Sequence, residues 1–164
     1  MTIRYTIVDS PMGRLLVAAT ERGVCAVEMG GSDAELARAL AREYPAGTIL
    51  RDDKHHLVWT RELLARSSGR PARVDLPLDV QATSFQWQVW QALAAIPRGK
   101  TRSYAEVAAS IDRPTAARAV ARACASNPVA LAIPCHRAVG SDGRLAGYRW
   151  GVARKQDLIE REQE

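Results

Sequence analysis

Three helix-start signals constrain most strongly how this chain can fold. In each, a Ser or Thr that can cap a helix stands three residues before a Glu or Gln that can hydrogen-bond back to it. The pairs are Ser32 with Glu35, Thr83 with Gln86, and Ser103 with Glu106. They predict helices that run to about Tyr44, to the break at Pro97, and to about Ser110. A further helix is expected over residues 55–65.

Short apolar runs precede the first of these helices. They are Arg4–Val8, Leu15–Ala19 and Val24–Met29. Turn residues at 10–13 and at 21–23 separate the runs. This spacing predicts three strands of an antiparallel meander.

The two halves of the chain differ in organisation and in charge. A break at 67–71 leads into a stretch with the composition of a linker, which extends to about Ala82. We expect an α+β protein with a scaffold domain and linker over residues 1–81 and a mostly helical domain over 82–164. Basic and acidic residues cancel at eleven each in 1–81, whereas 82–164 hold twelve basic and seven acidic residues. The net charge of +5 therefore lies in the second half, as in a module that binds a polyanion.

The sequence shows neither the features of a signal peptide nor the run of about 18 apolar residues that a membrane helix needs. We expect a soluble, cytoplasmic protein that binds no membrane. The cysteines Cys25, Cys124 and Cys135 are odd in number and form no C-x-x-C pair. This argues against a disulfide framework and against a cysteine-rich zinc site. Cys25 and Cys124 are expected to be small buried residues.

Two short helices joined by a tight turn are expected in the second half. The break at 112–114 separates the helix that starts at Ser103 from an alanine-rich helix over Thr115–Ala125, which is the outline of a helix-turn-helix. Arg118 and Arg122 lie four residues apart and share a face of the second helix. Asn and Gln, which would read adenine edges, are missing from it. Such a helix suits DNA binding with little regard to base sequence.

The reactive side chains are concentrated at the end of an apolar, strand-like segment. Pro134 closes this segment, and Cys135, His136 and Arg137 follow at once. A free cysteine has a pKa near 8.5, so only about 3% of it is thiolate at neutral pH, and a neighbouring imidazole or guanidinium favours that thiolate. Adjacent residues of a strand point to opposite faces, so Cys135 and His136 are expected on a turn or linked by a water. A buried cysteine beside a structural histidine would give the same pair.

The wider pattern of motifs resembles the O6-alkylguanine-DNA alkyltransferases, also called methylated-DNA–protein-cysteine methyltransferases. The run Ile133-Pro134-Cys135-His136-Arg137 is similar to the active-site signature of that family. Other matching motifs stand around it in family order; they are Ser10-Pro11-Met12-Gly13, Leu76-Pro77-Leu78, Phe85-Gln86, Val89-Trp90, Ile96-Pro97-Arg98-Gly99, Ser103-Tyr104, Ala117-Arg118-Ala119-Val120, Asn127-Pro128 and Gly147-Tyr148. The resemblance implies a small N-terminal ribonuclease-H-like antiparallel sheet with helices, followed by a winged helix-turn-helix-like domain.

The resemblance also implies a function, which is direct-reversal DNA repair. Proteins of this family flip the damaged guanine out of the duplex, because its alkyl carbon cannot be reached inside the stack. Cys135 would then accept the methyl or other alkyl group from O6 of guanine irreversibly, in a single turnover, with O4 of thymine as another substrate. The implied partner is double-stranded DNA that contains alkylated guanine, bound in the minor groove with little sequence specificity by a monomeric bacterial protein. No metal and no organic cofactor are implied.

Catalytic roles follow from the resemblance residue by residue. Cys135 would be the acceptor, and His136 would take its proton through a water. Glu162 would orient His136, although it lies two residues from the end of the chain, and Glu160 is the competing acid. Asn127 would brace the turn that carries the cysteine.

Contacts to DNA follow from the resemblance in the same way. Tyr104 would press on the phosphate of the flipped nucleotide and donate a hydrogen bond to the departing base. Arg118 would enter the base stack as a finger that fills the vacated space. Further DNA contacts are expected from the same helix, at Thr115, Ala116, Ala119 and Arg122.

The substrate pocket is expected to involve the residues around and after the signature. They are Pro134, Ala138, Tyr148, Arg149 and Trp150. Arg149 and Trp150 stand where many family members carry small residues, and this makes the chain similar to the methyltransferase half of the bacterial adaptive-response protein. Because an indole must occupy volume near the substrate, Trp150 is expected to narrow the pocket and to favour methyl over benzyl groups.

Two other functions are compatible with parts of this pattern. A relative that binds damaged DNA without repairing it would lack the acceptor cysteine, whereas Cys135 is present. A transcriptional regulator would need side chains that read bases, and the alanine-rich helix offers few of them.

Overall fold

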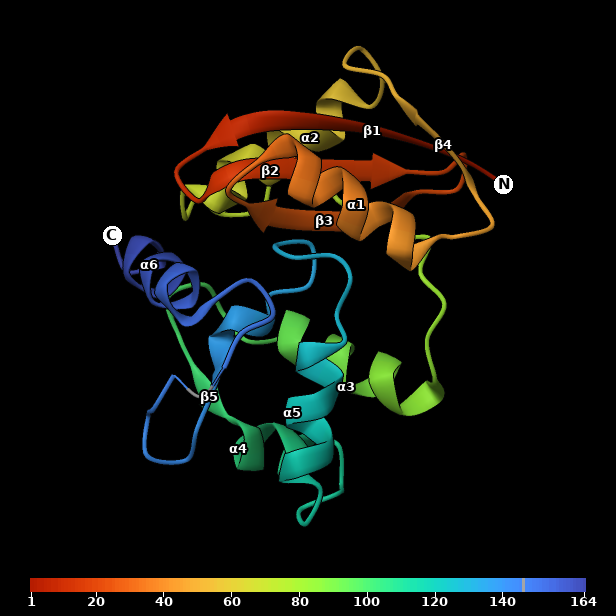
Figure 1. The fold of residues 1–164 in the computed structure, drawn as a ribbon. Helices are drawn as coiled ribbons and strands as arrows, with labels where there is room; N and C mark the ends of the chain where they lie inside the picture. Colours follow the sequence, from red (N-terminus) through yellow and green to blue (C-terminus); the bar gives the residue numbers. More distant parts are fainter. Residues whose placement is uncertain (146) are drawn as a thin grey trace. The chain divides into compact units, whose positions relative to one another are not determined.

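The computed structural model describes residues 1–145 and 147–164 and forms two compact units. The first unit consists of residues 1–80 together with 128–132, and the second consists of residues 81–127 together with 133–164. Figure 1 shows the order of the elements along the chain. The first unit thus takes a short segment from the second half of the sequence.

A four-stranded sheet forms the centre of the first unit (Figure 1). The strands β1 (Thr2–Ser10), β2 (Gly13–Ala19) and β3 (Val24–Gly30) form the predicted antiparallel meander. The strand β4 (Thr48–Arg51) pairs with β1 in parallel, which gives the order β3-β2-β1-β4. β4 thus adds one parallel pairing to the expected antiparallel sheet, because the helix between β3 and β4 returns the chain in the direction of β1.

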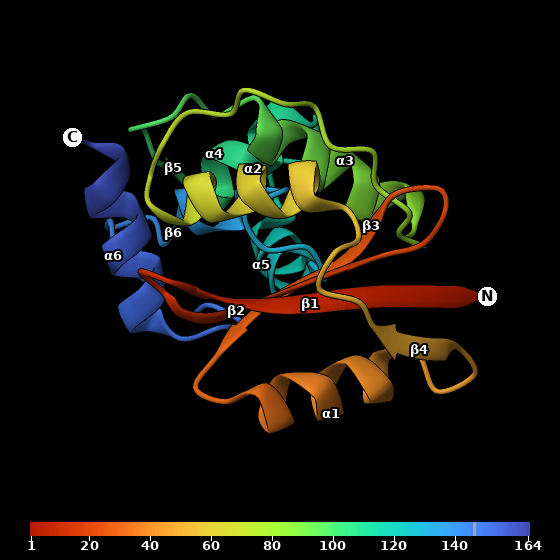
Figure 2. The same cartoon turned by 90° about the horizontal axis from the view of Figure 1, so that it is seen from above.

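Two helices cover opposite faces of this sheet, as Figure 2 shows. The helix α1 (Asp33–Glu43) begins where predicted, since the Ser32 side chain accepts a hydrogen bond from the Glu35 amide. The helix α2 (Leu57–Ser67) begins two residues later than predicted. The reason is that His56 has a left-handed backbone conformation, with φ of 52°, which a helix cannot continue through.

The core of the first unit lies between the sheet and α1. Ile3 and Ile7 of β1 and Leu16 of β2 pack there with Leu36 and Leu40 of α1, and all five are buried. Burying a Leu or Ile side chain contributes on the order of 2 kcal/mol. β3 is buried along its whole length, because both of its faces are covered.

Two outside segments hydrogen-bond to β3. The Val24 amide donates to the Pro77 carbonyl at 2.8 Å, and the Val27 amide donates to the Pro128 carbonyl at 3.0 Å. The second half of the expected linker is therefore held against the sheet. In place of the expected strand-like run before Pro134 there are isolated bridge residues, among them Val129 opposite Val27, and a turn in which Leu131 has φ of 70°.

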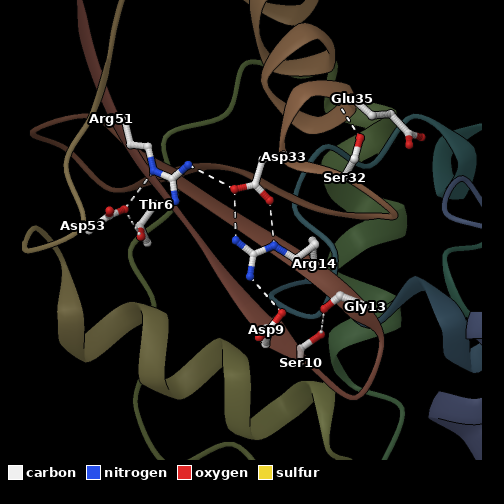
Figure 3. A network of polar contacts seen from close by, with 10 residues as sticks. All are labelled: Thr6, Asp9, Ser10, Gly13, Arg14, Ser32, Asp33, Glu35, Arg51 and Asp53. Carbon is white, nitrogen blue, oxygen red and sulfur yellow. Dashed lines mark hydrogen bonds and ion pairs between the residues drawn. The ribbon is translucent and has the colours of Figure 1, made fainter.

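A network of ion pairs links α1 to the sheet, as Figure 3 shows. The guanidinium of Arg14 on β2 donates to both oxygens of Asp33, the first residue of α1, at 2.7 and 3.0 Å. Arg51 of β4 donates to Asp33 at 3.1 Å and to Asp53 at 3.1 Å. A carboxylate at a helix N-terminus is also favoured by the helix dipole. The network holds the start of α1 against β2 and β4.

The second unit is mostly helical. Its elements are α3 (Ser84–Ala94), β5 (Arg102–Ser103), α4 (Tyr104–Ser110), α5 (Ala117–Ala125), the 3₁₀ turn η1 (Cys135–Arg137), β6 (Ala138–Val139) and α6 (Val152–Glu162). Of the three predicted pairs, the two in this unit form complete capping boxes, at the starts of α3 and α4. α5 begins two residues later than predicted, because Ala116 still belongs to the preceding turn and its amide donates to the Arg113 carbonyl.

Buried side chains of α3, α4 and α5 form the core of the second unit. Val89, Trp90 and Leu93 project from α3, and the Trp90 indole donates to the Ala123 carbonyl of α5 at 2.9 Å. β5 and β6 form a two-residue parallel pair. None of the helices in the described residues combines the length and the apolar character that crossing a bilayer requires.

Candidate active site

Cys135 lies on a tight turn of the second unit. It is the first residue of η1, where its amide donates to the Ile133 carbonyl at 2.8 Å and the Arg137 amide donates to the Pro134 carbonyl at 3.0 Å. The sequence left open whether Cys135 and His136 share a turn, and the structure places both on η1. Both side chains are only 2% exposed.

Asn127 fixes this turn from the end of α5. It is completely buried, and its side-chain amide donates to the Ile133 carbonyl at 3.1 Å and to Sγ of Cys135 at 3.2 Å. The expected bracing position is therefore occupied. The contact with sulfur adds a hydrogen bond that favours the thiolate over the thiol.

Burial keeps the resting sulfur protonated. It raises the pKa of the Cys135 thiol to about 11, against the hydrogen bond from Asn127 and the positive charges of Lys155 and Arg149. The sequence suggested that a neighbouring imidazole or guanidinium would stabilise the thiolate. In the structure, the amide of Asn127 and the ammonium of Lys155 are the main groups that do so. A base must therefore take the thiol proton when the sulfur reacts.

His136 faces an acid that comes from α6. Its Nε2 lies 2.9 Å from Oε1 of Glu162, a close contact in which the N–H is not aligned well enough for a hydrogen bond. Glu162 is 5% exposed, whereas Glu160 is exposed and accepts a hydrogen bond from Gln156. Relative burial therefore selects Glu162 over Glu160 as the partner of His136.

Arg137 binds the same carboxylate. Its Nε lies 3.0 Å from Oε1 and its second terminal nitrogen lies 2.8 Å from Oε2 of Glu162. Burial alone would raise the pKa of Glu162, but the contacts with His136 and Arg137 outweigh it and lower the pKa to about 2. Glu162 is therefore charged at neutral pH.

A cavity of about 230 Å³ opens beside Cys135 within the second unit. Its lining residues are Tyr104, Ala121, Cys124, Ala125, Cys135, Gly147, Tyr148, Arg149 and Lys155. Tyr148 and Arg149 thus lie where a substrate pocket was expected. The walls combine two phenols, two cations and small apolar side chains, which suits a planar polar ring better than a purely apolar ligand.

Three expected pocket residues do not line this cavity. The described residues that line it do not include Pro134, Ala138 or Trp150. Trp150 is 7% exposed and packs edge-on against Tyr148, with 5.2 Å between the ring centroids. The expectation that the indole walls the pocket directly is wrong, because the indole packs against a side chain of the wall instead.

Lys155 is the main residue of the site that the sequence motifs did not reveal. It is 1% exposed, and its Nζ donates to the Tyr104 hydroxyl at 3.2 Å and to the Gly147 carbonyl at 3.0 Å. Burial lowers the pKa of Lys155 below its usual value, against the pull of Cys124 and Cys135. The available signal was its spacing, since Lys155 precedes Leu158 and Glu162 on the buried face of α6.

Tyr104 lies at the first position of α4, directly after the cap Ser103. It is half-buried, and burial raises its pKa to about 12, so it is a neutral phenol that accepts the Lys155 hydrogen bond. Tyr104 also lines the cavity beside Cys135.

The residues expected to contact DNA lie at the start and along the outer face of α5. Thr115, Arg118 and Arg122 are exposed, and Ala116 and Ala119 are half-buried. Val120, Ala123 and Cys124 form the buried face of the helix. The two arginines therefore share the solvent side of α5, as their spacing predicts.

Comparisons with known proteins cover both halves of the chain. The family model described as "6-O-methylguanine DNA methyltransferase, ribonuclease-like domain" matches residues 3–80, and "6-O-methylguanine DNA methyltransferase, DNA binding domain" matches residues 84–164. Methylated-DNA–protein-cysteine methyltransferase of Methanosarcina barkeri is 40% identical over 159 residues, which cover 97% of this chain and 96% of that protein.

A longer relative and a solved structure extend this similarity. The bifunctional transcriptional activator/DNA repair enzyme Ada of Escherichia coli is 48% identical over the whole chain, but the chain spans only 46% of that protein. The crystal structure of Mycobacterium tuberculosis OGT in complex with DNA matches with a TM-score of 0.82 at 36% identity, over 99% of this chain and 93% of that one.

Proposed function

This chain belongs to the 6-O-methylguanine DNA methyltransferase family, and we propose that it repairs DNA by moving a methyl or other alkyl group from O6 of guanine to its own Cys135. The observation that carries this proposal is the position of Cys135. Its sulfur lies beside a cavity walled by Tyr104, Tyr148 and Lys155, on the same turn as His136. A flipped base that enters this cavity meets the nucleophile, and the proton acceptor is the next residue of the same turn.

The chemical step is an in-line displacement at the alkyl carbon. As His136 takes the thiol proton through a water, Sγ of Cys135 forms a bond to the alkyl carbon and the bond from that carbon to O6 breaks. The bonding electrons stay on guanine, and Tyr104 donates a hydrogen bond to the departing base. The thiol loses one proton to His136 and the guanine anion regains one from solvent, so the transfer balances without an oxidant or a reductant.

The surrounding groups stabilise the charge that moves during this step. Asn127 and Lys155 offset the negative charge on sulfur, which burial otherwise disfavours. Lys155 also donates to Tyr104, so its charge acts at both ends of the displacement. Arg137 and Glu162 flank His136, and Glu162 orients the imidazole.

DNA is bound through the helix-turn-helix formed by α4 and α5. Arg118 fills the space left by the flipped base, and Arg122 contacts the backbone on the same exposed face. Thr115, Ala116 and Ala119 allow close approach to the minor groove, because small side chains keep little distance between the helix and the duplex. With few base-reading side chains, a single copy of the protein binds with little sequence specificity.

The product is a thioether, whose sulfur is a poor leaving group, so each molecule acts once. O4 of alkylated thymine is a second substrate for the same sulfur. The test is the intact mass of the protein after incubation with an oligonucleotide that contains O6-methylguanine. We expect a gain of one methyl group, which is lost in Cys135→Ala and retained in Cys124→Ala, the matched cysteine of the same cavity. An unchanged mass in the parent protein would rule out the proposed function.

Three further measurements address the finer parts of the proposal. An oligonucleotide with O4-methylthymine tests the second substrate. Affinities for duplexes of unrelated sequence, at several salt concentrations, are expected to be similar to one another and to fall together as salt rises. Sedimentation with and without DNA tests whether one protein molecule acts alone, and a stable dimer without DNA would contradict this part.

A further inference from the structure

Glu162 has two cationic or basic neighbours that compete for one oxygen. Oε1 of Glu162 lies 3.0 Å from Nε of Arg137 and 2.9 Å from Nε2 of His136, while Oε2 binds Arg137 alone at 2.8 Å. The side chain of Arg137 is 16% exposed, that of Glu162 is 5% exposed and that of His136 is 2% exposed. The three groups form one buried cluster.

The charges of this cluster balance only when the imidazole is neutral. Arg137 is always protonated and Glu162 is ionised, so these two cancel. An imidazolium would leave a net charge of +1 in a buried place, which is unfavourable. Without the guanidinium, the same carboxylate would instead attract a proton to the imidazole.

Arg137 is also held in place independently of Glu162. Its first terminal nitrogen donates to the Ile96 carbonyl at 2.8 Å, just after the end of α3. The guanidinium therefore connects α3, η1 and α6. The planar guanidinium donates one hydrogen bond to each carboxylate oxygen of Glu162, and this fixes the orientation of the carboxylate.

The other ring nitrogen of His136 is placed to act as a base. Both ring nitrogens are buried, and neither has a well-aligned hydrogen-bond partner among the described residues. Nε2 lies 2.9 Å from the Glu162 carboxylate, so the ring proton belongs on Nε2 and Nδ1 is left as the acceptor. A buried polar atom in that situation calls for a water, which is the carrier that the proposed proton transfer needs.

We propose that Arg137 is a positioning residue of the alkyl transfer, which fixes Glu162 and offsets its charge so that His136 stays neutral and ready to accept the thiol proton. This inference rests on the proposed function. Among the described residues, Cys135 on η1, Tyr148 in the segment before α6 and the positive Arg154 of α6 also act on this cluster or on one another. The thiol and the phenol are neutral when at rest, since burial raises the pKa of each.

The test is the pH dependence of the single-turnover rate of methyl transfer in Arg137→Met. Loss of the guanidinium leaves the buried carboxylate unopposed, and an unopposed negative charge favours a positive charge on the neighbouring ring. We expect the acid limb of the rate profile to move to higher pH in the variant. The rate should then be about tenfold lower on the acid limb and should approach that of the parent at alkaline pH.

Three comparison variants separate this effect from a loss of folding. Arg137→Lys keeps the charge and should restore most of the parent profile. In Arg137→Met/Glu162→Gln the unopposed charge is gone, so the acid limb should return toward lower pH. Arg161→Met removes the ion pair between Arg161 and Asp157, which lies on α6 like Glu162, and should leave the pH profile unchanged.

Two results would overturn the inference. The first is an Arg137→Met profile that superimposes on that of the parent after scaling, since a merely structural arginine would lower the rate equally at every pH. The second is a profile of Arg137→Lys that matches that of Arg137→Met. Failure of the proposed function is a different outcome, because the parent protein would then gain no methyl group at any pH.

Discussion

Nζ of Lys155 lies 3.2 Å from the hydroxyl of Tyr104, and the ammonium also stands 5.5 Å from the centre of the Tyr104 ring. The partners of this buried ammonium, the phenol and the Gly147 carbonyl, are both neutral. Such a charge is expensive to bury, so its presence indicates a use.

Lys155→Met should therefore slow the reaction without weakening the fold. Met has a similar length and no charge, so the cost of burying the ammonium disappears and the thermal midpoint should stay equal or rise. The single-turnover rate of methyl transfer should fall about 100-fold, as when one preorganised donor is removed from an active site. Lys54→Met, at an exposed lysine of the first unit, is the control for both measurements. A rate equal to that of the parent would show that the charge has no part in the transfer.

In Glu162→Gln, the stability of the folded state should depend less on pH between 4.5 and 2 than it does in the parent. The pKa of Glu162 is lowered from its usual value of 4.5 to about 2, so the carboxylate stabilises the folded state above pH 4.5 and loses that effect as the pH falls toward 2. Urea midpoints of parent and variant should differ most at neutral pH and converge between pH 4.5 and 2. Glu160→Gln, the exposed acid of the same helix, should follow the parent throughout. A constant gap between parent and Glu162→Gln would contradict the assignment.

Gly23→Ala should destabilise the protein by forcing β3 away from the segment that pairs with it. A Cβ atom at Gly23 would lie 2.4 Å from the carbonyl oxygen of Pro77, and the backbone itself would have to move. Overpacking of this kind costs about 1–3 kcal/mol, which urea denaturation can measure. Gly47→Ala is the matched control, because its nearest contacts would be ordinary ones at 3.5 Å. Equal losses in the two variants would mean that the contact with Pro77 has no special effect.

Arg14→Met should lower the thermal midpoint by an amount that depends on salt. Arg14 joins Asp33 at the start of α1 to Asp9 at the end of β1, and these groups are partly open to solvent. Screening weakens such pairs, so the difference from the parent should shrink as salt is raised from 0.05 to 1 M. Asp142→Asn, which breaks an exposed pair with Arg144 in the second unit, should change the midpoint less at every salt concentration. A difference that persists at 1 M salt would point to lost packing instead.

The parts of the fold that the sequence could predict are those with local causes. The starts of α3 and α4 depend on Thr83, Ser103 and residues three positions away, and both capping boxes are present. β4 could not be predicted, because its four residues form a strand only by pairing with β1, more than forty positions away in the chain. The same holds for the bridge between Val27 and Val129, which takes the place of the expected strand.

In the candidate site, too, the features that could be predicted have local causes, and those that could not depend on residues distant in the sequence. Cys135, His136 and Asn127 lie together, as the motif run suggested, because Cys135 and His136 share one turn and Asn127 is close enough in sequence to donate to it. Lys155 was missed because its partners Tyr104 and Gly147 come from other elements. Trp150 was misplaced for a related reason, since sequence position gives the volume of a side chain but not the direction in which it packs.

Trp150→Ala should act on the substrate pocket through Tyr148. The indole is 7% exposed and packs against the Tyr148 ring at 5.2 Å, and the Arg149 guanidinium lies 5.5 Å from the indole. Its removal should cost about 3 kcal/mol of stability. It should also let Tyr148 retreat, so that free O6-benzylguanine inactivates the variant faster, relative to methylated DNA, than it inactivates the parent. Tyr148→Phe, which keeps the ring and its packing, should retain the preference for methyl groups. If benzylguanine inactivates the parent and Trp150→Ala equally fast, the indole does not limit the size of the alkyl group.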